Sequence, residues 1–208
     1  MPQINDKVLE TVLTTYEQAA EKLDSDSVPV YLFLAERFAN SSDISSDHVF
    51  QFLFRSYYRL DNAGLTDDFK KEYFRLLQNH RHEQVPDLRQ ICRTLRAYKT
   101  KRGKQSLQFS FATKILATID QDQPLYDRFV ASVFGFSPPL HKLAFEERLE
   151  KHLQFYEALK ETSRWLREQP ELKDVDALFA KREKQWHLVG RCKQIDFILW
   201  ATGKAMRA

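Results

Sequence analysis

Residues 106–130 read Ser-Leu-Gln-Phe-Ser-Phe-Ala-Thr-Lys-Ile-Leu-Ala-Thr-Ile-Asp-Gln-Asp-Gln-Pro-Leu-Tyr-Asp-Arg-Phe-Val. Within this stretch Lys114 follows a run of small residues and stands before an apolar helical turn. Asp127 comes thirteen positions later, three residues after Pro124. The pattern predicts two short neighbouring helices, one with an amine near its start and one with a carboxylate at its start. An amine beside a carboxylate suits chemistry at a sugar carbon.

The whole chain has the pattern of an all-α protein. Only five of 208 residues are glycine, and runs that alternate apolar and polar residues are almost absent, which argues against a large sheet. Hydrophobic residues make up 43% of the chain, enough for a sizeable core. We see no repeat or linker and therefore expect a single domain over 1–208, with helices at about 8–23, 30–38, from 46, from 66, 87–98, 141–169, 175–187 and 189–202.

Other features indicate what this protein lacks. No run of eighteen apolar residues and no signal peptide is present, so we expect a cytoplasmic protein that does not contact a membrane. The two cysteines, Cys92 and Cys192, are too few for an iron–sulfur cluster and are expected to be reduced core residues. His80-Arg81-His82-Glu83 has no further ligand at metal spacing. We therefore expect no metal and no cofactor.

Positive charge is concentrated in one part of the chain. No acidic residue lies between Asp87 and Asp120, whereas eight lysines and arginines do: Arg89, Arg93, Arg96, Lys99, Lys101, Arg102, Lys104 and Lys114. Neutralising DNA phosphates requires such a patch. A solvated basic helix face is the alternative. The loop with Lys101, Arg102 and Lys104 is the predicted DNA contact.

A lysine becomes a nucleophile when its amine loses its proton near neutral pH. We expect Lys114 in the first turn of a helix, where unpaired N–H groups and the basic tract lower its pKa. Asp127 at the next helix start accepts backbone N–H groups and stays ionised. Such a carboxylate stabilises an oxocarbenium-like transition state. The alternative is an ordinary surface lysine and an ordinary helix cap.

Residues 110–114, followed by 124–130, resemble the core of the helix-hairpin-helix DNA glycosylases, and more narrowly the bacterial proteins similar to 8-oxoguanine DNA glycosylase. Residues 191–204 resemble the last helix of the same group. The resemblance implies a helix-hairpin-helix core at about 86–137 in an all-α fold that can form two lobes around a cleft. It implies double-stranded DNA as the partner and oxidised guanine as the substrate.

The resemblance also implies roles for individual residues. Lys114 matches the Schiff-base nucleophile, and Asp127 matches the carboxylate that follows a proline-led turn. Ser110 and Ala112 stand at the two glycine positions of the phosphate-binding hairpin, with Thr113 beside them. Both carry a Cβ where a phosphate approaches the backbone and where positive φ is expected in the family. Asp196 and Trp200, on the last helix, match the wall that recognises the extruded base.

The sequence leaves one leading hypothesis for the function and two alternatives. The leading hypothesis is a DNA glycosylase with associated lyase activity. The first alternative is a non-catalytic helical DNA-binding or interaction module that keeps the glycosylase core. The second is a helical protein–protein adaptor. The sequence does not fix the recognised base or the oligomeric state.

Overall fold

The computed structural model describes residues 2–83, 86–137 and 142–207, and these residues form an all-α fold. Among them there is no strand, and the one β-bridge joins Leu65 to Thr100. The helices are α1 (Pro2–Lys22), α2 (Ser27–Asn40), α3 (His48–Tyr57), α4 (Asp67–Asn79), α5 (Leu88–Arg96), α6 (Phe109–Ile119), α7 (Arg128–Val133), α8 (Phe145–Leu166), α9 (Lys173–Arg182) and α10 (Arg191–Ala205). Short 3₁₀ turns cover Asp61–Ala63, Pro170–Leu172 and Trp186–Leu188.

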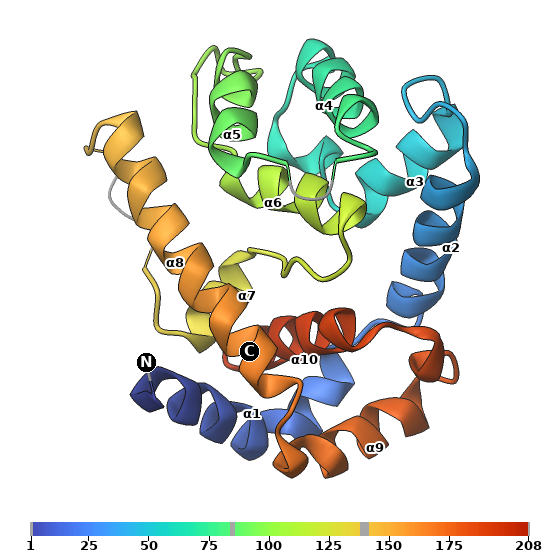
Figure 1. The fold of residues 1–208 in the computed structure, drawn as a ribbon, viewed down its shortest axis with the longest axis vertical. Helices are drawn as coiled ribbons and strands as arrows, with labels where there is room; N and C mark the ends of the chain where they lie inside the picture. Colours follow the sequence, from blue (N-terminus) through green and yellow to red (C-terminus); the bar gives the residue numbers. More distant parts are fainter. Residues whose placement is uncertain (1, 84–85, 138–141, 208) are drawn as a thin grey trace.

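The helices gather at two ends of the molecule (Figure 1). Helices α3, α4, α5 and α6 lie in the upper half, where α6 packs against α4 and α5. Helices α1, α9 and α10 lie in the lower half, where α10 packs against α1 and also against α7. Helices α2 and α8 connect the two halves on opposite sides of the view. The chain between α6 and α7 therefore runs between the two groups of helices.

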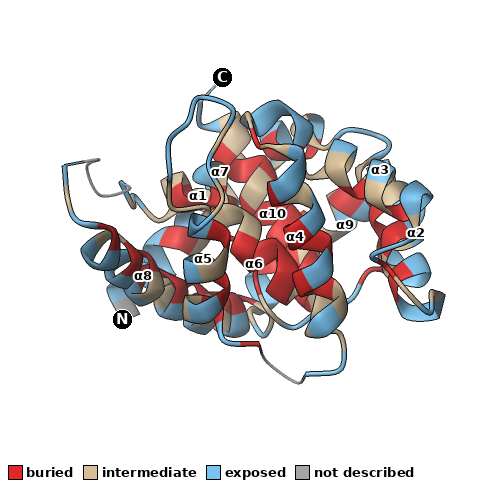
Figure 2. Ribbon diagram, turned by 90° about the horizontal axis from the view of Figure 1, so that it is seen from above, coloured by how far each residue is buried: buried red, intermediate tan, exposed pale blue. Residues whose placement is uncertain are grey.

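Aromatic side chains fill much of the core (Figure 2 shows the buried positions on the inner helix faces). In the upper half, Phe50 and Phe54 lie with ring centroids 5.4 Å apart, and Tyr73 and Phe74 meet them edge-on or tilted. Burying one such ring contributes about 1.5–3 kcal/mol. Many of the phenylalanines in the sequence thus pack in the protein core.

The helix starts follow from capping residues that the sequence marks. The Thr66 hydroxyl accepts the Phe69 amide at 3.3 Å, and the Asp87 carboxylate accepts the Arg89 amide at 2.8 Å. Each such cap stabilises its helix by about 1 kcal/mol because it pairs an otherwise free N–H group. The predicted starts from 66 and near 87 are confirmed.

The C-terminal helices differ from their predicted bounds. Helix α9 ends at Arg182 instead of near residue 187, because the backbone turns to extended geometry at Glu183 and a 3₁₀ turn follows. Helix α10 starts at Arg191, after Gly190 as its N-cap residue, and continues to Ala205. The predicted start of the long helix at 141 lies outside the described residues, and the described helix begins at Phe145.

Both cysteines are free and buried, as expected. Burial raises the pKa of each thiol to about 12, so neither is a reactive thiolate at neutral pH. The described residues contain no cluster of histidine, cysteine and acidic side chains that could hold a metal ion. Of the helices described, none has both the length and the apolar character needed to cross a membrane.

Candidate functional site

Lys114 lies in the second turn of α6 with its side chain turned inward. Only 8% of the residue is exposed. Its ammonium donates to the Ser110 hydroxyl at 2.7 Å and to the Ser110 carbonyl at 3.2 Å. The rings of Phe111 and Tyr58 lie 5.1 and 5.7 Å from Nζ. The prediction that Lys114 sits in the first helical turn is wrong, since α6 begins five residues earlier, at Phe109.

The pKa of Lys114 is lowered, but the cause differs from the predicted one. Burial lowers it from 10.5 to about 8, while the Asp127 carboxylate acts in the opposite direction and the Lys193 ammonium adds to the decrease. The helix start and the basic tract are not the source. At pH 7.5 about a quarter of such amines are neutral, compared with about one in a thousand for an ordinary lysine.

The three small residues before Lys114 belong to regular helix instead of a hairpin turn. Ala112 and Thr113 are fully buried, and the amides of Phe111 and Ala112 both donate to the Gln108 carbonyl at 3.0 Å. The expected positive φ at the glycine places does not occur, because Arg59 alone among the described non-glycine residues has positive φ. Any phosphate at this helix start would therefore meet Ser110 before Ala112 or Thr113.

Asp127 caps α7, as the sequence predicts. Its Oδ1 accepts the Phe129 amide at 2.7 Å. Among the described residues it forms no ion pair with Lys114, yet its charge raises the pKa of that lysine. The amine and the carboxylate are thus coupled electrostatically without forming an ion pair.

The segment 124–127 holds Asp127 in this position through backbone hydrogen bonds. The Tyr126 amide donates to the Thr113 hydroxyl at 3.2 Å, directly beside Lys114 on α6. The preceding amide, that of Leu125, donates to the Asp196 carboxylate on α10 at 3.2 Å. Two consecutive amides therefore link α6 to α10, and the segment carries Asp127 between them.

Asp196 is buried with only 4% of the residue exposed. Besides the Leu125 amide, its carboxylate pairs with the Lys193 ammonium at 3.5 Å, and burial raises the pKa of its carboxyl group. The Lys193 ammonium also lies 5.3 Å from the Tyr31 ring centroid. Sequence reasoning did not single out Lys193 or Tyr31. The spacing of Lys193 and Asp196, three apart on one helix, is the signal that could have found the pair.

Trp200 lies one turn further along α10 and is half-buried. Its ring meets the Phe129 ring edge-on, with centroids 6.1 Å apart. The Lys204 ammonium lies 4.6 Å from the centroid of the Trp200 ring. The structure thus places Trp200 beside the first residues of α7, which directly follow Asp127 in the sequence. Asp196 and Trp200 occupy the face of α10 that meets the 124–129 region.

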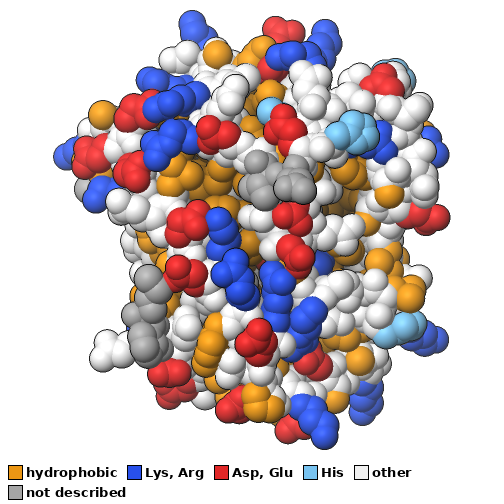
Figure 3. Space-filling model, in the orientation of Figure 1, with side chains coloured by type: hydrophobic (Ala, Val, Ile, Leu, Met, Phe, Trp, Pro, Cys, Tyr) orange, Lys and Arg blue, Asp and Glu red, His pale blue; other side chains and the backbone are white. Residues whose placement is uncertain are grey.

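The basic tract separates into the α5 arginines, which have acidic or aromatic partners, and the loop with Lys101, Arg102 and Lys104. Arg89 and Arg93 on α5 form ion pairs with Glu150 and Glu146 on α8 at 2.6 and 2.8 Å, and the Arg96 guanidinium stacks 4.1 Å from the Phe145 ring centroid. On the face in Figure 3, Lys and Arg side chains are likewise mixed with Asp and Glu side chains. The eight charges therefore do not form one continuous free patch.

Lys101, Arg102 and Lys104 are exposed on a firmly anchored loop. The Lys101 amide donates to the Gly64 carbonyl at 2.8 Å, and the Thr100 amide donates to the Lys104 carbonyl at 2.9 Å. Gly103 has φ +72°, which permits the tight turn between them. The three cations are thus presented by a fixed turn and stay the predicted phosphate contacts.

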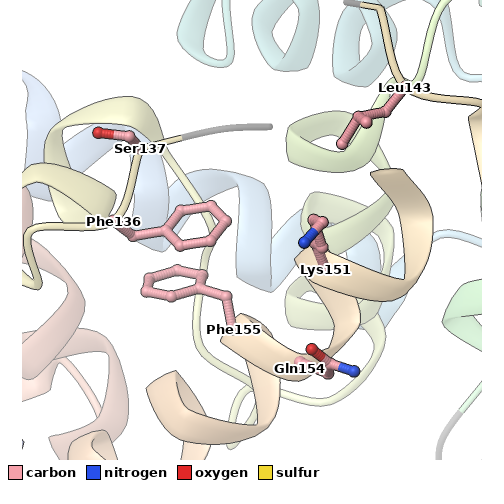
Figure 4. Close-up of a pocket in the computed structure, with 6 residues that line it drawn as sticks. All are labelled: Phe136, Ser137, Leu143, Lys151, Gln154 and Phe155. Atoms are coloured by element: carbon pink, nitrogen blue, oxygen red, sulfur yellow. The ribbon is translucent and has the colours of Figure 1, made fainter. Parts of the chain in front are cut away.

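Two open hollows border α8. The first, of about 550 Å³, has a floor of stacked Phe136 and Phe155 rings with centroids 4.1 Å apart, and Lys151 and Gln154 stand beside them (Figure 4). The second, of about 390 Å³, lies between α5, α6 and α8. Their described linings include neither Lys114 nor Asp127. In this conformation the amine is closed off from both hollows.

Fold and geometry together define an all-α protein in which a buried lysine is electrostatically coupled to a helix-capping carboxylate. Searches of protein-family models, curated proteins and solved structures found no match to this chain.

Proposed function

We propose that this protein is a DNA glycosylase with Schiff-base lyase activity, in which Lys114 is the nucleophile and Asp127 stabilises the transition state. The observation that carries the proposal is the buried Lys114 amine, with its pKa near 8, in the field of the Asp127 carboxylate. Among the described residues the Lys114 ammonium forms no ion pair and donates its hydrogen bonds to the hydroxyl and carbonyl of Ser110. A buried lysine without a paired carboxylate destabilises the fold, so a chemical role gives a reason for its burial.

The neutral Lys114 amine would attack C1′ of a damaged nucleotide. A bond forms between Nζ and C1′ while the bond from C1′ to the base breaks, and the electron pair leaves with the base. The nitrogen gives one proton to the departing base. The C1′–O4′ bond then breaks as the nitrogen lone pair forms the imine, and O4′ takes up the second nitrogen proton to become a hydroxyl. The Asp127 carboxylate stabilises the positive charge that develops at C1′.

We further propose that α3–α6 and α1 with α7–α10 act as the two lobes of a glycosylase-like fold. The segment 124–127 lies between them, and the target nucleotide would enter beside it. Because only 8% of Lys114 is exposed, entry requires the lobes to separate or Tyr58 to move aside. Asp196 and Trp200 would then border the extruded base, with oxidised guanine as the substrate class.

Double-stranded DNA would be held by Lys101, Arg102 and Lys104, with the Ser110 end of α6 nearest the strand. We propose that the protein works in the cytoplasm. No cofactor takes part in the proposed chemistry, because the lysine supplies the nucleophile and the nucleotide supplies the leaving group.

Borohydride trapping tests this proposal. The wild type, Lys114→Gln and Asp127→Asn are incubated with duplexes that carry 8-oxoguanine or an abasic site, and borohydride is added to reduce any imine. Lys160→Gln, which removes a lysine on α8, is the control. We expect an adduct with the wild type and the control, none with Lys114→Gln, and a slower one with Asp127→Asn.

The burial of Lys114 also favours a second candidate, a non-catalytic helical DNA-binding module. If the amine never reaches a nucleotide, its hydrogen bonds to Ser110 are simply structural. Salt-sensitive DNA binding without any borohydride adduct would support this module and contradict the enzyme.

A further inference from the structure

Lys193, on α10, is the second buried lysine among the described residues. Only 6% of the residue is exposed. Its ammonium lies between the rings of Phe197 and Tyr31, at 5.1 and 5.3 Å from their centroids, and its direct charge partner is Asp196 at 3.5 Å. Hydrophobic side chains of the same volume often stabilise a fold as well as or better than a buried ion pair. Stability of the core alone therefore does not explain why a lysine is buried at position 193.

The two buried lysines are held close to one another by the 124–127 segment. The consecutive amides of Leu125 and Tyr126 donate to Asp196 and to Thr113, each at 3.2 Å. Asp196 holds the Lys193 ammonium, and Thr113 directly precedes Lys114. Helices α10 and α6 thus meet this segment one residue apart, and their lysines belong to one buried cluster.

We propose that Lys193 is a positioning residue for the nucleophile: its buried ammonium, fixed by Asp196 between two aromatic rings, opposes a second positive charge on Lys114. This inference rests on the proposed function for its catalytic meaning. Lys193 forms an ion pair with a carboxylate, whereas within the described part of the chain Lys114 forms none and donates hydrogen bonds to the oxygens of Ser110. Of the two, Lys114 is therefore the one that releases its proton first.

Burial lowers the pKa of both lysines; the Asp127 carboxylate opposes this at Lys114, and the Asp196 carboxylate opposes it at Lys193. Facing Lys114 are Tyr58 at the end of α3, Asp127 at the start of α7 and Lys193 on α10. Facing Lys193 are Tyr31 on α2 and its own helix neighbours Asp196 and Cys192. Burial raises the pKa of both tyrosines, so they stay neutral and supply no counter-charge. The Lys193 charge accordingly lowers the pKa of Lys114.

Titration of the two amines in the folded, DNA-free protein tests the inference. The lysines are labelled with ¹³C at Cε, and their NMR shifts are followed from pH 6 to pH 11. We assign the signals by their loss in Lys114→Met and Lys193→Met. In Lys193→Met the pKa of Lys114 is expected to rise by roughly half to one pH unit, the order that one partly buried unit charge produces.

Two further variants separate charge from structure. Lys193→Arg keeps the positive charge and is expected to leave the Lys114 pKa at its wild-type value. Lys204→Met removes a lysine from the same helix outside the cluster and is expected to change nothing. An unchanged Lys114 pKa in folded Lys193→Met would overturn the inference.

A second neutral variant keeps the test decisive if Lys193→Met does not fold. Lys193→Gln also removes the positive charge and is expected to raise the pKa of Lys114, whereas Lys114→Met should leave the pKa of Lys193 unchanged, because Lys114 has already lost its proton when Lys193 titrates. An unchanged Lys114 pKa in folded Lys193→Gln contradicts the inference. The result is also independent of the enzymatic proposal: shifts without a DNA adduct would refute the glycosylase alone, and an adduct without shifts would refute the role of Lys193 alone.

Discussion

A Cβ atom added to Gly203 on α10 would lie 2.0 Å from the carbonyl oxygen of Phe129 on α7. The backbones of the two helices touch at this point, and no side chain larger than hydrogen fits between them. Because Phe129 follows Asp127 by two residues, this contact fixes the capping carboxylate relative to α10. Gly203 therefore matters for the site although it bears no functional group.

Gly203→Ala is expected to lower the free energy of unfolding by about 3 kcal/mol, since backbone atoms must move to admit the methyl group. Urea denaturation measures the change. Gly190→Ala is the matched control, because a Cβ at Gly190 meets nothing within 4 Å. Its cost should stay below about 1 kcal/mol, the size of a helix-cap effect. Equal losses in the two variants would mean that α7 and α10 are not in backbone contact.

Lys114→Met is expected to stabilise the protein at pH 7. Burial lowers the pKa of Lys114 to about 8, so between pH 8 and 10.5 the unfolded chain holds a proton that the folded protein lacks. Wild-type stability consequently rises with pH across that window, and the cost of the buried charge is fully present below it. Removing the charge should therefore gain up to about 3 kcal/mol at pH 7.

The stabilisation by Lys114→Met should shrink as the pH rises from 8 towards 10.5. Urea denaturation at pH 7 and pH 9.5 gives the comparison. Lys160→Met removes a lysine that forms an ion pair with Glu157 at 2.9 Å near the surface, and it should change stability by less than about 1 kcal/mol at either pH. A destabilised Lys114→Met at pH 7 would contradict the lowered pKa.

Asp127→Asn is expected to lower the pKa of Lys114 further below 8, because it removes the charge that favours the ammonium. Asparagine caps a helix about as well as aspartate, so the fold should be retained. NMR titration of Lys114 provides the measurement. Asp87→Asn changes the equivalent cap on α5 and should leave the Lys114 pKa unaltered. A Lys114 pKa that rises or stays constant in Asp127→Asn would show that the two groups do not face one another.

Replacing Lys101, Arg102 and Lys104 together by glutamate should abolish most duplex binding. Loss of three phosphate contacts reduces the slope of log affinity against log salt by about three. The control variant replaces Lys173, Lys181 and Lys184 by glutamate, on and just after α9, at the opposite end of the molecule from α5 and α6 (Figure 1). Fluorescence anisotropy at several salt concentrations compares them. If both triple variants lose affinity alike, binding is unspecific and the loop is not the DNA contact.

The sequence predicts helix starts well because capping is local. Thr66, Asp87 and Asp127 all accept the amides that their positions imply. The cap position of Asp127 was predicted from the sequence, whereas the roles of Lys114 and Asp127 stay predictions. The start of α6 was misplaced because its N-cap residue, Gln108, makes no side-chain capping hydrogen bond, so the sequence carries no capping signal there.

Tertiary contacts account for what the sequence does not reveal. Arg89 and Arg93 look like free charges until α8 brings Glu146 and Glu150 beside them. Lys193 looks like an ordinary helix lysine until Tyr31, far away in the sequence, covers it. Burial of a charged group depends on which helices pack together, and the helical periodicity of a sequence does not predict that packing.

The most direct test of the central claim is to locate the borohydride-reduced adduct by mass spectrometry. The wild-type protein is reduced in the presence of an abasic or 8-oxoguanine duplex, digested with nuclease and protease, and its peptides are sequenced. The account predicts a sugar remnant on Lys114 and on no other lysine. A remnant on a different lysine, or no remnant on a protein that binds the duplex, would contradict it.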